Sequence, residues 1–523
     1  MNENRRVARA TSVIGGATLF SRLFGYIRDM VLAGFLGAGR VSDAFFVAFT
    51  IPNLMRRLFA EGSLTIAFIP VFTEQLQKKG RAEAFAMAGS ALRLLSVILL
   101  VVTVVGVLLS PAIVHVVGWG WTVDQPEKFE LTVTLTRIMF PYVFFICLVA
   151  LCMGILNALG YFAAPALAPV LLNVAMIAAI GGVSVLSDDA LVRVKGLAVG
   201  VVVGGIMQLA LQVPFLIRAG LSFRTKAALY HPALKKVGYL MLPAVFGAAV
   251  YQINIIVGRM LATMLPEGSV SYLYYADRLV QFPLGVFAIS GAMAALPSMS
   301  RQAAAGDYEA VVDTFSYSLK LIFFISLPAM TGLIVLREPM VALLFQHGKF
   351  GDEAVRLTAY ALLLYAAGLW AVSAVRILVS AFYALSDTRT PVRIAVIATL
   401  ANIVFSLALM GPLGHGGLAL ATSLAAVLNF GLLLRALQVK LGWLGLGALV
   451  PAVVRYAFSS AVMGLAVWQV SLRVIPPEAG LAGQLLGMVF CVGVGVACYL
   501  ILSYSLHSRE LKDLIKALKK TDD

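Results

Sequence analysis

Fourteen apolar runs dominate the sequence, and each is long enough, at roughly 20 residues or more, to cross a bilayer as a helix. The second run is interrupted at Pro52 and at Glu61-Gly62. The composition agrees, because 61% of the 523 residues are hydrophobic and only 12% are charged. Soluble domains contain about 25% charged residues. The sequence therefore predicts an all-α polytopic membrane protein with about 14 transmembrane helices. The runs lie near residues 10–36, 41–74, 84–110, 130–157, 163–186, 195–217, 237–264, 269–298, 311–336, 354–384, 391–411, 416–438, 450–474 and 480–505.

Residue types that carry enzymatic or metal chemistry show no pattern. The four cysteines lie inside apolar runs, and the five histidines are scattered without ligand spacing. The sequence has no Gly-x-x-x-x-Gly-Lys-Ser/Thr loop for nucleotide phosphates. We therefore expect no enzyme, no catalytic residue, no metal site and no cofactor. The net charge of +15 is assigned to basic cytoplasmic loops and buried cations, so we expect no nucleic-acid partner.

Basic residues cluster beside particular runs and predict the orientation of the chain. An even number of spans places both termini on one side of the membrane, and excess lysine and arginine marks the cytoplasmic side. We therefore expect both termini to be cytoplasmic. The clusters that precede the first run and follow the second, sixth and last runs comprise Arg5, Arg6, Arg9, Lys78, Lys79, Arg81, Arg218, Arg224, Lys226, Lys235, Lys236, Arg509, Lys512, Lys516, Lys519 and Lys520.

An internal repeat divides the spans into two sets of six. Leu92-Arg93-Leu94 recurs as Leu319-Lys320-Leu321, and Pro70 recurs as Pro297, with one offset of 227 (320 − 93 and 297 − 70). Repeats with an even number of spans have the same orientation, as in transporters built from two parallel lobes. We predict two pseudo-symmetric six-helix lobes, residues 1–220 and 221–440, followed by two extra spans and a basic tail in 441–523. The alternative is that apolar helices resemble one another by chance.

Ionisable residues inside the spans are the candidate functional groups. A charge at the bilayer centre costs about 2.5–3.5 kcal/mol, so such residues usually face a cavity or pair with one another. Arg22 and Arg56 lie well inside their runs and have no adjacent carboxylate, whereas the others could neutralise one another. The charges are concentrated in the first, second and eighth runs: Arg22, Arg28, Asp29, Asp43, Arg56, Arg57, Glu61, Asp277 and Arg278.

The excess of arginine indicates the chemistry of the substrate. Guanidinium groups bind phosphate and carboxylate through two parallel hydrogen bonds and stay charged. A cavity lined by them repels a cationic drug and accepts an anionic, phosphorylated molecule. A drug/cation antiporter would instead require a carboxylate-rich cavity.

Several motifs resemble those of one family. Ser21–Asp29, Ser42–Phe49 and Pro52–Arg57 carry the resemblance, and Tyr274–Arg278 and Phe345–Phe350 extend it. Together these segments are similar to the MurJ (MviN) family of the multidrug/oligosaccharidyl-lipid/polysaccharide exporter superfamily. The resemblance implies a lipid II flippase for peptidoglycan synthesis, cell wall biogenesis and cell shape.

The resemblance also implies a mechanism and a location. Lipid II, the undecaprenyl-pyrophosphate-linked peptidoglycan precursor, would move from the inner to the outer leaflet of the bacterial cytoplasmic (inner) membrane by alternating access. The two extra C-terminal helices would form a groove for the lipid tail. We expect lipid II and membrane lipids as partners and a monomer as the functional unit. The alternative substrate is another prenyl-pyrophosphate-linked glycan.

Site residues follow by matching motif positions. Substrate binding is implied for Arg22, Arg28, Arg56, Arg278 and Asp43, and gating or charge pairing for Asp29, Arg57, Glu61 and Asp277. Relatives can carry glutamate where this chain has Gln281, which leaves the role of that position open. Some relatives bind sodium in the C-terminal lobe, for which Asn254, Asn402 and Thr422 are the nearest candidates here. These candidates include no clear carboxylate, so the resemblance leaves two alternatives open as the energy source, sodium and the membrane potential.

Overall fold

The computed structural model describes residues 3–58, 64–222, 228–475, 480–508 and 510–513. Within these ranges the regular structure is helical throughout, and no strand occurs among the described residues. Among the described residues, ten helices are long and apolar enough to cross a membrane, or eleven if the bent pair Asp352–Ala366 and Leu369–Ala384 counts as one span. The prediction of an all-α polytopic membrane protein is confirmed, but the number of 14 spans is not. Each of the fourteen runs nevertheless coincides with one helix or with two or three consecutive helical segments.

Two compact units divide the chain. The first comprises residues 1–271 together with His347–Phe350, and the second comprises Tyr272–Gln346 and residues 351–523. The helices of the first unit are α1 (Glu3–Leu36), α2 (Arg40–Met55), α3 (Leu64–Lys78), α4 (Gly80–Leu108), α5 (Ser110–Val117), the 3₁₀ turn η2 (Trp119–Trp121), α6 (Pro126–Met139), α7 (Tyr142–Ala158), α8 (Ala163–Leu186), α9 (Ala190–Arg218) and α10 (Ala233–Thr263). α11 (Ser269–Pro283) begins in the first unit and continues into the second.

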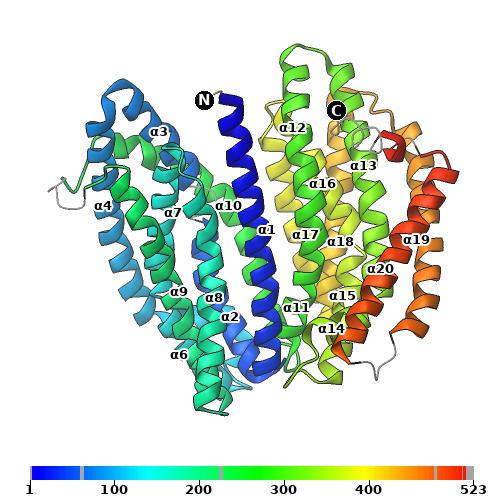
Figure 1. Cartoon of the computed structure of the whole chain (residues 1–523), viewed down its shortest axis with the longest axis horizontal. Coiled ribbons are helices and arrows are strands. Elements are labelled where there is room, and N and C mark those ends of the chain that lie inside the picture. The colour runs from blue at the N-terminus through cyan, green and yellow to red at the C-terminus, as the bar shows by residue number, and fades with distance from the viewer. Residues whose placement is uncertain (1–2, 59–63, 223–227, 476–479, 509, 514–523) are drawn as a thin grey trace. The chain divides into compact units, whose positions relative to one another are not determined.

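Helices of the first unit pack along two seams. α1 lies beside α8, and α8 packs on α9 (Figure 1). A second group joins α3, α4 and α7 around a core of small and aromatic residues that includes Phe68, Phe72 and Met87. α10 packs on α3 and on η2 and therefore belongs to this unit, although the sequence repeat places it after the boundary at residue 220.

Residues His347–Phe350 form a loop that docks on the end of α1. The amide of Lys349 donates to the carbonyl oxygen of Gly34 at 2.9 Å. Gly348 has φ +56, and a Cβ atom there would lie 2.4 Å from the same carbonyl oxygen. Gly37 has φ +70, and its Cβ would lie 2.8 Å from the Lys349 carbonyl. Two glycines therefore permit an approach that any side chain would block.

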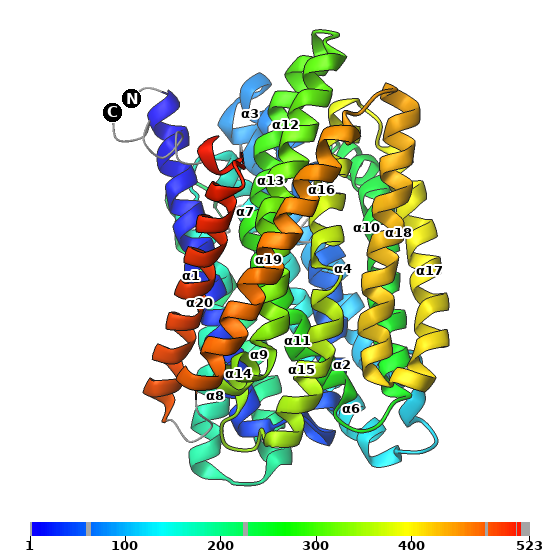
Figure 2. The same cartoon turned by 90° about the vertical axis from the view of Figure 1, so that its right-hand side faces the viewer.

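The second unit contains the remaining helices. They are the π-helical turn η3 (Leu284–Ala288), α12 (Ile289–Ala304), α13 (Tyr308–Val335), α14 (Arg337–Phe345), α15 (Asp352–Ala366), α16 (Leu369–Ala384), α17 (Arg389–Leu413), α18 (His415–Leu441), α19 (Leu446–Val474) and α20 (Leu481–Ser505). α13 packs on α16 and on α19, and α19 lies beside α20 (Figure 2). The last two helices thus extend the unit at one face of α13.

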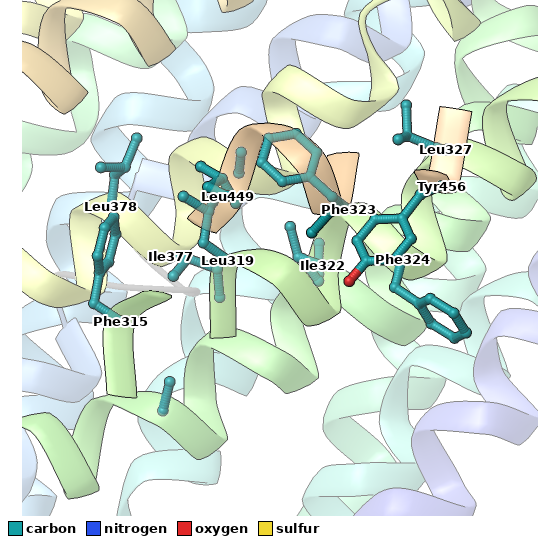
Figure 3. Close-up of a cluster of buried hydrophobic side chains, with 14 of the residues drawn as sticks. Phe315, Leu319, Ile322, Phe323, Phe324, Leu327, Ile377, Leu378, Leu449 and Tyr456 are labelled. Atoms are coloured by element: carbon teal, nitrogen blue, oxygen red, sulfur yellow. The ribbon is translucent and has the colours of Figure 1, made fainter. Parts of the chain in front are cut away.

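A continuous apolar core stabilises this arrangement. α13 contributes Phe315, Leu319 and Phe323 to this core, and α16 contributes Leu378 (Figure 3). Tyr456 of α19 stacks edge-on against Phe324, with ring centroids 5.4 Å apart. Burying a large apolar side chain contributes about 1.5–3 kcal/mol, so this core fixes α19 on α13.

Candidate functional site

Arg28 is held inside the first unit by two polar partners. Its guanidinium donates to Oδ1 of Asp29 from Nε at 3.0 Å and from Nη2 at 2.7 Å. Nη1 donates to Oδ1 of Asn173 on α8 at 3.0 Å. Asn173 in turn donates to the carbonyl oxygen of Ser21 at 3.3 Å, which ties α8 to α1 one residue before Arg22. Arg28 is 7% exposed and Asp29 is fully buried, so this is an internal ion pair in a shielded environment.

Arg22 differs from Arg28 although both lie on α1. Its side chain is half-buried, and among the described residues it has no hydrogen bond or ion pair. Six residues separate it from Arg28, so the two lie on different faces of the helix. A guanidinium without a protein partner retains all five N–H donors for a ligand.

Arg56 follows the last residue of α2 and folds back on it. Nε and Nη2 donate to Oδ1 of Asn53 at 3.1 and 3.0 Å. Pro52 lies within α2, and the helix continues past it to Met55, so the prediction that the run breaks at Pro52 is wrong. The other predicted break, Glu61-Gly62, lies outside the described residues. Arg57 is half-buried and makes no ion pair with a described residue. Its predicted partner Glu61 lies outside the described residues.

Asp43 lies at the start of α2, and its carboxylate accepts four hydrogen bonds. Oδ1 accepts from the amide of Ser271 at 2.9 Å and from its hydroxyl at 2.6 Å. Oδ2 accepts from the amide of Gly268 and from Nζ of Lys128, both at 2.8 Å. Asp43 is 1% exposed and Lys128 is 2% exposed. Four donors therefore occupy the lone pairs of this carboxylate.

α11 carries the remaining charged residues. Asp277 accepts a hydrogen bond from the side-chain amide of Gln281, one helical turn later. A glutamate at residue 281 could not donate that bond while ionised, so Gln281 changes the partner of Asp277. Arg278 is half-buried on the same helix, in the second unit.

The three sodium candidates fall on both units. Asn402 of α17 is 7% exposed, and its amide nitrogen lies 3.5 Å from Oγ1 of Thr422 on α18. That geometry leaves the amide oxygen of Asn402 available as a ligand. Asn254 belongs to the first unit, and its buried Oδ1 has no hydrogen-bond partner among the described residues. No group of three or more His, Cys, Asp or Glu side chains with metal-site geometry occurs in the described ranges.

Sequence reasoning missed two residues of these networks. Lys128 lies between the predicted spans 84–110 and 130–157, outside both of them. The structure places it in the first turn of α6, with Nζ 4.3 Å from the ring centroid of Trp121. Asn173 was missed because a neutral amide in an apolar run gives no charge signal. The only hint for Lys128 was its position as a lone cation just before an apolar helix.

Comparison with known proteins places these networks in a family. The family model described as "Lipid II flippase MurJ" matches residues 32–479. The chain belongs to the MurJ family. A Vibrio cholerae serotype O1 protein named "Probable lipid II flippase MurJ" is 39% identical over 518 residues, covering 98% of each chain. A Burkholderia cenocepacia protein named "Lipid II flippase MurJ" is 38% identical over 453 residues, covering 83% of this chain and 86% of the relative.

Solved structures agree with this assignment. A structure described as "Lipid II flippase MurJ, inward closed conformation" superimposes with a TM-score of 0.80 at 25% identity, covering 96% of this chain and 99% of that one. An inward-facing multidrug resistance MATE transporter of the MOP superfamily gives a TM-score of 0.70 at 17% identity, covering 81% of this chain and 95% of that one, which shows a shared fold. The resemblance found in the sequence motifs is therefore confirmed for this MurJ family member, a multi-pass membrane protein.

Proposed function

We propose that this protein flips lipid II from the inner to the outer leaflet of the bacterial inner membrane by alternating access. Membership of the MurJ family and the names of its relatives support the substrate. The transport moves a molecule without making or breaking a covalent bond, so the proposal requires no catalytic residue. We further propose that it acts as a monomer, with both termini in the cytoplasm and two six-helix lobes as the moving parts.

The observation that carries the proposal is the unpartnered guanidinium of Arg22. A charge within a membrane helix costs about 2.5–3.5 kcal/mol, and Arg22 recovers none of this through a described protein partner. A pyrophosphate offers acceptor pairs at the spacing of the guanidinium fork. We propose that Arg22, Arg28, Arg56 and Arg278 hold the pyrophosphate. Other prenyl-pyrophosphate-linked glycans present the same group and are the alternative substrates.

The charge of the site supports a role for the membrane potential. Moving one elementary charge across 100 mV is worth about 2.3 kcal/mol, and bound pyrophosphate would offset several arginine charges. We propose that the potential favours return of the empty carrier. Sodium coupling through Asn254, Asn402 and Thr422 is a further proposal. Asn402→Ala should then remove any sodium dependence of flipping while leaving the dependence on potential.

Charge pairing completes the proposed mechanism. Asp29 holds Arg28 with two hydrogen bonds, and Asp277 accepts from Gln281. We propose that such pairs, with Arg57 and Glu61, exchange partners when access alternates.

The test measures lipid II on the periplasmic face of cells depleted of this protein. An externally added toxin that degrades lipid II reports accessibility. We expect exposure to be lost on depletion and restored by the wild type and by Arg301→Ala, which changes an exposed arginine of α12. Arg22→Ala should fail to restore it although the protein accumulates normally. Restoration by Arg22→Ala would contradict the assigned site, and unchanged exposure on depletion, with no second flippase in the cell, would favour another glycan.

A further inference from the structure

The first turn of α11 has no cap of its own. The helix begins at Ser269, and the preceding residue, Gly268, has φ +89 and no side chain. The first amides of a helix need acceptors, which an N-cap side chain usually supplies. Glycine cannot supply one, so another part of the chain must.

Asp43 supplies this cap from α2. Its carboxylate accepts from the amide of Gly268 at 2.8 Å and from the amide of Ser271 at 2.9 Å. These are the N-cap and N3 amides, which a capping box satisfies with two side chains of the same helix. Here one carboxylate, 225 and 228 residues away in sequence, satisfies both. A negative charge at a helix N-terminus is also favoured by the helix dipole.

The capping is reciprocal. Oε1 of Glu267 accepts from the amide of Arg40, the first residue of α2, at 2.6 Å. The two helix starts therefore exchange carboxylates, Asp43 to α11 and Glu267 to α2. Arg40 and Glu267 are 227 residues apart, which equals the offset of the sequence repeat (320 − 93). Equivalent positions of the repeat thus meet at this point.

Lys128 neutralises the buried carboxylate. Nζ lies 2.8 Å from Oδ2 of Asp43 and 4.3 Å from the ring centroid of Trp121, which is itself 1% exposed. A buried charge is costly unless it is paired and hydrogen-bonded, and the Asp43–Lys128 contact provides both. Lys128 therefore pairs with the carboxylate, while its ammonium group also lies over the ring of Trp121.

We propose that Asp43, held by Lys128, is a positioning residue that fixes the start of α11 and thereby the placement of Arg278. Arg278 lies nine residues after Ser269 (278 − 269), or about two and a half turns along the same helix. Asp43 then acts through α11 instead of contacting the substrate, which is the role implied by its motif. The link to activity rests on the proposed function, because Arg278 is there a ligand of the pyrophosphate.

The structural arm measures amide hydrogen exchange in the full-length protein, over a peptide that contains residues 266–272. Asp43→Asn removes an acceptor from Gly268 or from Lys128, and we expect exchange in this peptide to accelerate about tenfold or more. Asp188→Asn is the matched control, because Asp188 forms an ion pair with Arg193 while its side chain is solvent-exposed. Exchange unchanged by Asp43→Asn would overturn the proposal. If this variant does not accumulate, Lys128→Met serves instead, with an expected acceleration of about twofold to fivefold because three donors to Asp43 remain.

The functional arm uses a compensating change. Asp43→Asn leaves the ammonium of Lys128 buried without its counter-ion, and Lys128→Met removes that charge. We expect the double variant to recover at least about a tenth of wild-type lipid II exposure, whereas Asp43→Asn alone recovers almost none. If Asp43 contacts the substrate, Lys128→Met brings no recovery. The two arms can fail separately. If Asp43→Asn accelerates exchange in residues 266–272 but the wild-type protein does not flip lipid II, the proposed function is refuted and the capping role of Asp43 stands.

Discussion

Two buried ion pairs in the first unit satisfy their charges in different ways. Arg28 and Asp29 are neighbours in sequence on α1, and one amide from α8 completes the set. Lys128 and Asp43 are 85 residues apart, and their carboxylate also caps a third helix. The first pair can be recognised in the sequence, whereas the second exists only when α2, α6 and α11 are assembled. The Lys128–Asp43 pair therefore depends on the tertiary structure, whereas the Arg28–Asp29 pair forms within one helix.

Removing Arg28 should have the largest effect on stability. Arg28→Ala takes two hydrogen bonds from the fully buried Asp29, and breaking a buried pair costs about 3–5 kcal/mol. We expect a large fall in the thermal unfolding midpoint of the purified protein. Asp29→Asn combined with Arg28→Ala should recover much of this stability without recovering lipid II exposure. Equal midpoints for Arg28→Ala and the control Arg301→Ala would show that the pair is not stabilising.

Removing Lys128 should cost less. After Lys128→Met, Asp43 retains the amides of Gly268 and Ser271 and the Ser271 hydroxyl as donors. We expect a loss of about 2 kcal/mol in the free energy of unfolding, below that of Arg28→Ala. Lys195→Met, at an exposed position of α9, is the control. A larger loss than for Arg28→Ala would reverse the order of the two pairs.

The loop His347–Phe350 contacts α1 through the backbone, so its contribution to stability can be compared with those of the ion pairs. Gly348→Ala places a Cβ 2.4 Å from the Gly34 carbonyl and forces a left-handed backbone on alanine, so we expect a loss of about 1–3 kcal/mol. Gly414 has the same φ of +56 with nothing within 4 Å of its Cβ. Gly414→Ala therefore measures the backbone strain alone. Similar unfolding midpoints for the two variants would mean that the close approach to Gly34 contributes nothing.

An exposed pair should contribute least among the ion pairs, and its contribution should depend on pH. Asp387 accepts from Lys440 at 2.7 Å and from Thr390, and these partners hold the pKa of Asp387 well below its usual range. The pair then stabilises the folded state above the ordinary aspartate pKa and loses this contribution as pH falls through the lowered value. We expect Asp387→Asn to cost less than about 1 kcal/mol at pH 7. The difference from wild type should shrink below about pH 4, and a difference that grows on acidification would contradict the assignment.

Replacing Arg22 should have the smallest effect on stability, because no described residue forms a hydrogen bond or ion pair with it. We expect Arg22→Ala to change the free energy of unfolding by less than about 0.5 kcal/mol while abolishing lipid II exposure. Arg22→Lys keeps the positive charge but loses the paired N–H donors of the guanidinium, so we expect it to restore little lipid II exposure. Destabilisation by Arg22→Ala comparable to that of Arg28→Ala would mean that Arg22 is a structural residue.

The sequence predicted the parts of the molecule that depend on local chemistry. Apolar runs located the helices, and the motif around Arg22 and Arg28 indicated the family. The break predicted at Pro52 was wrong, because α2 continues through this proline to Met55. The cap of α11 could not be predicted, because Gly268 reveals that a cap is missing but not which residue replaces it. Lys128 lies outside the predicted spans, and its burial could not be predicted because it arises only from the packing of α6 and η2.

The docked loop His347–Phe350 has a consequence for biosynthesis. Lys349 pairs with Gly34, 315 residues earlier (349 − 34), so the first unit closes only after about two-thirds of the chain has been made. The ribosome adds about 5–20 residues per second, which leaves the end of α1 waiting for tens of seconds in the membrane. During that interval the carbonyl of Gly34 lacks the partner that it has in the finished protein. Chaperoning of this end by the insertion machinery would then matter most before α14 and the loop that follows it emerge.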